Sequence, residues 1–217
     1  MATATDLHVL TLAQWLSPAF PVGAFAYSHG LEWLIETGDV SDAPSMETWL
    51  RDILDLGGGR ADIQFLAAAW HAPDRDALEE TDALCRAFAS SAERLRETTL
   101  QGEAFCRTVA DVWHRDLPPL TYPIAVGHAA RLNDLPLPLT AQMYLQAVMS
   151  NLVAAGMRLI PLGQTDGQRI IHTLTPLCAD IADDAITQDL SHLSSTTFLG
   201  DIAAMKHETQ HTRIFRT

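Results

Sequence analysis

The chain has 217 residues, 14 of them basic and 27 acidic, which gives a formal net charge of −13 at pH 7. A chain of this length is expected to form one domain whose core needs no disulfide or metal staple. The acidic balance argues against a nucleic-acid binder and against binding to an anionic membrane surface. It favours a basic protein partner or a cation.

Three cysteines, Cys85, Cys106 and Cys178, lie far apart among apolar residues. They form no C-x-x-C pair, so they predict buried free thiols in a reducing compartment. The first ten residues lack the basic and long apolar segments of a signal peptide. Polar residues interrupt the apolar window at 144–163, which argues against a membrane span. We therefore expect a cytoplasmic protein.

Apolar residues recur at helical spacing along nearly the whole chain, which predicts an all-α fold. The first helix is expected over residues 7–16, followed by a proline-rich turn and a reversal at Gly23. A second helix is predicted from residue 24 to about residue 36, with Gly30 inside it. A glycine inside a helix costs about 1 kcal/mol relative to alanine, so Gly30 is expected to serve close backbone approach.

The next helix is expected to begin near Met46 and to end at the glycines 57–59. Ser90 followed by Glu93 predicts a capping box at the start of a long helix. Apolar or small residues on that helix recur at intervals of four and three, and a neighbouring helix is expected to come close at its glycine. This face comprises Leu95, Thr99, Gly102, Cys106, Val109 and Trp113.

Two later helices are predicted from caps at Thr140 and at Thr165, the second followed by Gln168 as a capping box. Pro176 is expected to kink or end the second of these helices. Residues 180–197 are expected to form a surface connection.

These elements predict a single-domain helical bundle of roughly nine or ten helices. An all-helical domain is expected at residues 1–200, with a partner-docking tail at residues 201–217.

His207 and His211 enclose an H-E-x-x-H pattern, in which two histidines on a helix bind zinc and the glutamate activates water. Taken alone, this pattern predicts a zinc metallohydrolase. However, no histidine or acid follows His211, and the end of a chain holds a rigid site poorly. A zinc hydrolase and a nickel-binding metallochaperone therefore remain only as alternative functions. The two histidines are weak candidates for binding a divalent ion.

Nucleotide chemistry is not expected, because no G-x-x-x-x-G-K-[ST] loop occurs and Arg60 follows the glycines 57–59. No Gly-x-Ser-x-Gly elbow is present either. The sequence therefore predicts no catalytic residue, no cofactor and no resident metal.

Three separated segments resemble the urease accessory protein UreF family. Residues 17–32 fit its P-x-G-x-F-x-x-S-x-G-L-E pattern, and residues 149–168 end in its R-x-x-P-L-G-Q-T-x-G-Q pattern. Residues 201–216 fit D-I-x-x-M-x-H-E-x-Q-x-x-R-x-F-R. His211 stands where that family often has an aromatic residue, so the match to the H-E-x-x-H zinc pattern depends on this single position.

The resemblance implies an all-helical, homodimeric and non-catalytic protein of urease maturation. Members of that family bind the accessory protein UreD (also called UreH) and recruit UreG, a GTP-hydrolysing nickel carrier. The assembly docks on apo-urease and promotes nickel insertion.

The resemblance also suggests which residues contact partners. On the expected UreG side these are Tyr27, Ser28, Gly30 and Glu32, which alternatively hold a buried turn together. On the expected UreD side they are Met205, His207, Glu208, Gln210, Arg213, Ile214, Phe215 and Arg216. The alternative for the tail is that it folds back on its own bundle.

A third group of residues is expected to be structural or to lie at the dimer interface: Pro21, Gly23, Arg158, Pro161, Gly163 and Gln164. In particular, Arg158 and Gln164 are expected to satisfy backbone carbonyls at the Pro161 break or to face the second copy.

Overall fold

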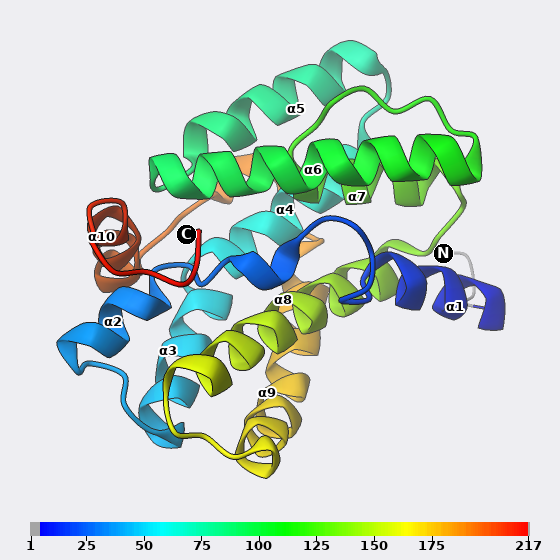
Figure 1. Cartoon of the computed structure of the whole chain (residues 1–217). Coiled ribbons are helices and arrows are strands. Elements are labelled where there is room, and N and C mark those ends of the chain that lie inside the picture. Colours follow the sequence, from blue (N-terminus) through cyan, green and yellow to red (C-terminus); the bar gives the residue numbers. More distant parts are fainter. Residues whose placement is uncertain (1–4, 217) are drawn as a thin grey trace.

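The computed structural model describes residues 5–216 and shows α-helices joined by irregular connections, with no β-strand in that range (Figure 1). The predicted all-α, single-domain fold is confirmed. The helices are α1 (Asp6–Trp15), α2 (Leu31–Thr37), α3 (Ala43–Asp55), α4 (Gly58–His71), α5 (Arg75–Phe88), α6 (Ala92–Trp113), α7 (Tyr122–Leu132), α8 (Leu137–Leu159), α9 (Gln164–Ala185) and α10 (Phe198–His207). Two short 3-10 helices are η1 (Ala24–Ala26) and η2 (Leu190–His192). The predicted domain boundaries also take in residues 1–4 and 217, which lie outside the described part of the chain.

Helix α4 is the centre of the core because it is buried on almost every side, and its two buried polar side chains, Asp62 and Gln64, are hydrogen-bonded. It packs most extensively against α7, which in turn contacts α6, while α8 packs on α9. Helix α10 lies beside α2 and the N-terminal end of α6, at one end of the bundle (Figure 1). The boundary predicted between residues 200 and 201 therefore falls inside α10.

Close contact between α6 and the start of α7 depends on Gly102. A Cβ atom there would lie 2.0 Å from the carbonyl oxygen of Leu120, so the predicted close approach is confirmed. The face of α6 that is buried in the structure is rotated slightly around the helix axis from the predicted apolar face. Leu95 and Trp113 are only half-buried, whereas Gln101 and Phe105 are buried.

Two predicted helix starts are wrong, by one residue in α6 and by four residues in α8. Helix α6 is capped by Ser91, whose hydroxyl accepts a hydrogen bond from the amide of Arg94 at 3.0 Å, so the box of Ser90 and Glu93 does not form. Helix α8 begins at Leu137, and Thr140 lies inside its first turn. Prolines fit the first turn of a helix, and the prolines flanking Leu137 start α8 earlier than the threonine pattern predicts.

Helix α9 begins at Gln164, with Gly163 rather than Thr165 at its N-cap. It continues past Pro176 to Ala185, so the helix does not end at the proline, which was one of the two predicted outcomes there. The surface connection predicted over residues 180–197 begins only after residue 185. A proline inside a helix costs about 3 kcal/mol or more. Packing against α8 overrides this cost, since buried side chains lie on both sides of Pro176.

The cysteines Cys85, Cys106 and Cys178 are free and buried, as predicted. Burial raises the pKa of Cys85 to about 12, and it raises the pKa of Cys106 and Cys178 to about 11. At neutral pH all three are therefore protonated thiols. Separately, no helix within residues 5–216 combines the length and apolar character needed to cross a bilayer.

The change Gly102→Ala is expected to destabilise the fold by about 1–3 kcal/mol, the usual cost of overpacking. The reason is that the new methyl group meets backbone atoms of Leu120 and Thr121, which cannot rotate away. Chemical denaturation measures the loss. The matched control is Gly58→Ala, where a Cβ meets nothing within 4 Å, and it should leave stability unchanged or higher. Equal stability of the two variants would contradict the close contact.

The three thiols are expected to resist a thiol reagent in the native protein at pH 8, because the reactive species is the thiolate and these pKa values are raised. Titration with a chromogenic disulfide should detect three thiols only after the chain is unfolded. A thiol that reacts rapidly in the folded protein would show that one of these positions is open to solvent.

Candidate functional site

The string at residues 17–32 forms two short elements rather than the start of a long helix. The helix predicted from residue 24 is wrong, because η1 ends at Ala26 and α2 begins only at Leu31. Gly30 lies just before α2 with φ at 78°, a left-handed conformation that favours glycine. A Cβ on Gly30 would lie 2.6 Å from the backbone nitrogen of Ala204 in α10. The expected close backbone approach is therefore confirmed, although Gly30 does not lie inside a helix.

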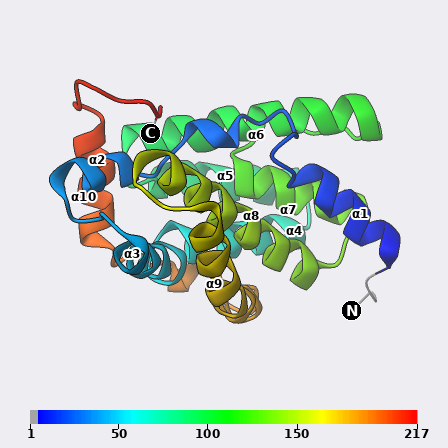
Figure 2. The same ribbon diagram turned by 60° about the horizontal axis from the view of Figure 1, so that its bottom comes forward.

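The segment that follows α10, residues 208–216 and called the tail below, folds back onto the bundle. Figures 1 and 2 show it leaving α10 and ending beside α6 and the segment around η1. The amide of Arg216 donates to the carbonyl oxygen of Ala26 at 2.8 Å. Phe215 is only 3% exposed, whereas Ile214 is 67% exposed. In the isolated chain the tail thus covers its own bundle, and its docking on a partner stays a prediction.

Glu32 of α2 is the principal polar anchor of the tail. Its carboxylate accepts hydrogen bonds from the amides of Ile214 and Phe215, at 2.7 and 2.9 Å. The residue is only 7% exposed, and a buried carboxylate needs such donors to offset its lost hydration. Glu32 therefore ties the tail to the start of α2.

His207, the last residue of α10, is fully buried between two carboxylates. Its Nδ1 lies 2.7 Å from Glu93 of α6, and its Nε2 lies 3.3 Å from Glu32. Arg213 donates to the other oxygen of Glu93 at 2.6 Å and also reaches the carbonyl oxygen of His207 at 3.3 Å. These contacts join α2, α6, α10 and the tail at one point.

Arg158, near the end of α8, holds the tail from the other side. Its guanidinium carbon lies 4.9 Å from the centre of the Phe215 ring, a cation–π contact. The same guanidinium donates to the carbonyl oxygen of Phe25 at 3.2 Å. It therefore satisfies a carbonyl of the turn at residues 17–32, not one at the Pro161 break as predicted. We call Glu32, Glu93, Arg158 and His207 the tail clasp.

Two further tail residues bind the bundle. The carboxylate of Glu208 accepts from the amide of Ala92 at 2.9 Å, and a negative charge is favoured at the start of a helix such as α6. The side-chain amide of Gln210 is hydrogen-bonded to Glu36 of α2. The three segments that resemble the family, residues 17–32, 149–168 and 201–216, are therefore in contact with one another around the tail.

The H-E-x-x-H pattern lacks the geometry of a zinc site. Helix α10 ends at His207, and His211 is an exposed residue of the irregular tail, so the two imidazoles do not share a helical face. Both ring nitrogens of His207 face carboxylates of the clasp. Within residues 5–216, no three histidine, cysteine or acidic side chains gather in a way that holds a metal ion.

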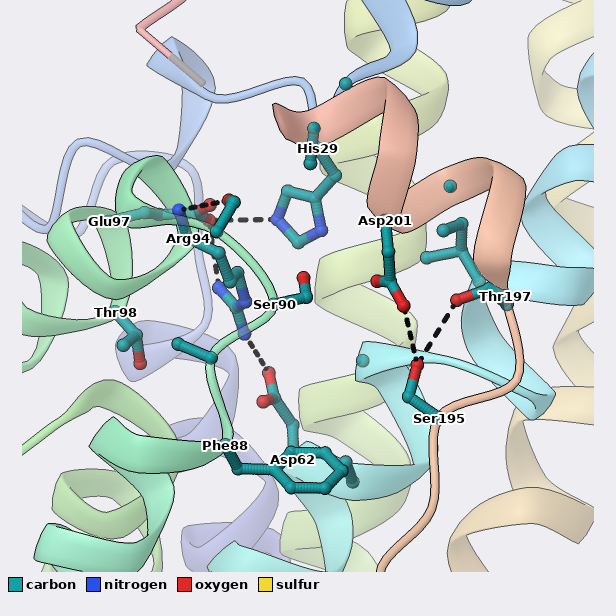
Figure 3. Close-up of a pocket in the computed structure, with 18 of the residues that line it drawn as sticks. His29, Asp62, Phe88, Ser90, Arg94, Glu97, Thr98, Ser195, Thr197 and Asp201 are labelled. Atoms are coloured by element: carbon teal, nitrogen blue, oxygen red, sulfur yellow. Dashed lines mark hydrogen bonds and ion pairs between the residues drawn. The ribbon is translucent and has the colours of Figure 1, made fainter. Parts of the chain in front are cut away.

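A second polar cluster lies in the interior beside the tail clasp and surrounds a cavity of about 70 Å3 (Figure 3). Arg94 pairs with Asp62 at 2.6 Å and with Glu97 at 3.3 Å, while His29 lies 2.9 Å from Glu97. Burial acts to lower the pKa of Arg94, but these two carboxylates outweigh it, so the pKa is raised. Because these charges are paired with one another, the cluster fastens α4, α6 and the turn before α2.

The remaining predicted residues differ in exposure. Tyr27 and Ser28 are buried, so the structure fits the alternative in which they hold a turn together. Gly23 is half-buried, and the other predicted positions lie on the surface. These exposed residues are Pro21, Pro161, Gly163, Gln164 and Met205, and their role at a partner or dimer interface stays a prediction.

The sequence carries no signal for the part that Glu93 plays, because the capping-box pattern accounts for this residue in another way. Glu36 belongs to no motif either. The partner of each lies more than a hundred residues away along the chain, and no local pattern encodes such a pairing.

These features define a class of protein: an all-α single domain whose C-terminal tail is held on the helices by the tail clasp. The UreF family model matches residues 40–175. The urease accessory protein UreF of Ruegeria pomeroyi is 58% identical over 217 residues, all of both chains. The UreF protein of Ruegeria sp. strain TM1040 is 53% identical, in an alignment that covers 98% of this chain and all of the relative. The UreF protein of Roseobacter denitrificans is 50% identical, in an alignment that covers 96% of this chain and 93% of the relative. The chain belongs to the UreF family of urease accessory proteins.

The change Glu32→Gln is expected to loosen the tail. A glutamine side chain has one acceptor oxygen in place of two and carries no charge, so it cannot hold both amides equally well. Native-state hydrogen exchange should show protection of the Ile214 and Phe215 amides falling roughly tenfold or more. The control is Glu80→Gln on the exposed face of α5, which should leave these amides unchanged. Unaltered protection in Glu32→Gln would show that the carboxylate is not the anchor.

Proposed function

We propose that this protein is a non-catalytic scaffold of urease maturation. In this role it binds UreD (UreH), recruits the GTPase UreG, and promotes nickel insertion into apo-urease, acting as a homodimer. Membership of the UreF family supports the proposal, since the relatives are named urease accessory proteins. The absence of a nucleotide-binding loop in the sequence fits a division of labour in which another protein hydrolyses GTP.

The observation that carries the binding role is the outer face of α10. Four large apolar side chains are exposed there at helical spacing: Phe198 by 71%, Leu199 by 78%, Ile202 by 50% and Met205 by 51%. Phe198 and Leu199 also line a groove of about 630 Å3 with Trp49 and Leu56. An exposed apolar surface of this kind marks a protein interaction site.

The position of α10 explains how partner binding on its outer face would affect the rest of the site. Its inner face packs on Gly30, and its last residue, His207, belongs to the tail clasp. A partner that moves α10 also moves the clasp and the turn before α2. We therefore assign the α10 face to UreD and the surface around the buried Tyr27 and Glu32 to UreG.

The double variant Leu199→Asp/Ile202→Asp is expected to lose co-purification with UreD. Charges on the exposed face would have to be buried unpaired at an interface, which is costly. The matched control is Val112→Asp, an exposed apolar position on α6 away from α10, which should retain UreD. Far-UV circular dichroism should be the same for all three proteins. Retention of UreD by the double variant would remove the α10 face as its docking site.

A urease operon that lacks this gene tests the function itself. Supplying the wild-type gene should restore urease activity and the nickel content of urease. The purified protein should keep little metal after dialysis, as expected for a scaffold. One tightly held equivalent of zinc would support the metallohydrolase, and several weakly held nickel ions would support the metallochaperone.

A further inference from the structure

A hollow of about 490 Å3 lies where the tail crosses α6. Three of its lining residues are arginines, although the chain as a whole carries a net charge of −13. The lining residues are Tyr27, Arg96, Leu100, Arg213, Phe215 and Arg216. We call it the arginine hollow.

The three arginines differ in whether a carboxylate is paired with them in the described part of the chain. Arg213 is paired with Glu93 of the clasp. Within residues 5–216, neither Arg96 nor Arg216 forms an ion pair with a carboxylate. Other arginines of the described chain also lack such a pair, and what distinguishes Arg96 and Arg216 is their shared position at one hollow.

The buried phenol of Tyr27 shows that these two charges converge. Burial and the charge of Glu97 raise the pKa of Tyr27, whereas Arg216 and Arg96 act against the increase. Both guanidinium groups therefore lie close enough to act on one hydroxyl group. The amide of Arg216, held on the carbonyl oxygen of Ala26, fixes this side of the hollow.

The shape and lining of the hollow indicate the kind of ligand. Guanidinium groups bind carboxylates through paired hydrogen bonds, and arginine clusters recognise acidic segments. Phe215 and Leu100 supply apolar contact between the charges. The arginines are exposed at the surface, so the hollow suits an extended segment lying across it rather than an enclosed small molecule.

We propose that the arginine hollow binds an acidic segment of a protein partner. Carboxylates of that segment pair with Arg96 and Arg216, and an apolar side chain between them lies against Phe215 and Leu100. The inference rests on the proposed scaffold function in one respect only, namely that a protein partner exists.

The test uses the full-length protein and a fluorescein-labelled peptide, EDLED, with the uncharged peptide QNLQN for comparison. Fluorescence anisotropy at low salt should show EDLED binding, with QNLQN at least roughly tenfold weaker. Added salt should weaken the binding of EDLED, because the pairs are exposed to solvent. Equal binding of the two peptides would overturn the inference.

Variants locate the site. Arg96→Gln and Arg216→Gln should each weaken EDLED binding roughly tenfold. The control is Arg107→Gln, an exposed arginine eleven positions further along α6, and therefore on the same side of the helix about 16 Å away. If Arg107→Gln weakens binding as much as the other two variants, binding is due to general charge and the inference is wrong. Displacement of the peptide by an equal concentration of inorganic phosphate would also overturn it in favour of a free-anion site.

The same variants separate this inference from the proposed function. A wild-type gene that restores urease in the operon assay while the protein fails to bind EDLED leaves the scaffold function standing and removes the acidic-segment site. A protein that binds EDLED through Arg96 and Arg216 but cannot restore urease keeps the site and removes the maturation function.

Discussion

The carboxylate of Glu32 is the contact on which the rest of the site depends. It brings together the amides of Ile214 and Phe215 and the imidazole of His207, three groups from the C-terminal end of the chain. A buried carboxylate without donors is costly, and the tail without an acceptor would leave two amides unsatisfied. Each side therefore requires the other, and these hydrogen bonds tie α2, α10 and the tail together.

Polar attachment has a consequence for how the tail behaves. Apolar burial is proportional to area and has no direction, whereas hydrogen bonds to charged groups depend on geometry and are weakened when water enters. Only Phe215 adds a large buried apolar side chain to the tail, and its ring is covered by the cation of Arg158. Local opening of this segment therefore needs much less free energy than unfolding of the α4–α7 core. Such a segment is suited to being rearranged when a partner binds.

The sequence was sufficient to predict the all-α fold, the first helix, the buried thiols and the close approach at Gly102, because each depends on short-range periodicity or residue size. The helix starts were less predictable. Thr140 and Thr165 satisfy a capping pattern, but Pro136 and Gly163 occupy the caps and the helices begin earlier. Pro176 lies inside α9 because packing on α8 outweighs the local cost.

The family patterns identified most of the residues around the tail, but not their arrangement. Nothing local predicts that Glu93 binds His207 rather than capping α6, or that Arg158 reaches Phe25 and Phe215. These pairings join residues from opposite ends of the chain, so only the packed helices bring them together. The local pattern likewise predicts Gly30 inside a helix, whereas it lies just before α2 in a left-handed conformation, against the backbone of α10.

The buried thiols have a meaning for a protein proposed to work beside a nickel carrier. Thiolate sulfur is a strong ligand for late transition metals, and a surface cysteine on a scaffold would capture ions intended for an enzyme. Here Cys85, Cys106 and Cys178 are enclosed and protonated. The folded chain therefore withholds its softest donors from any ion passing nearby, and it is equally protected from oxidants that attack exposed sulfur.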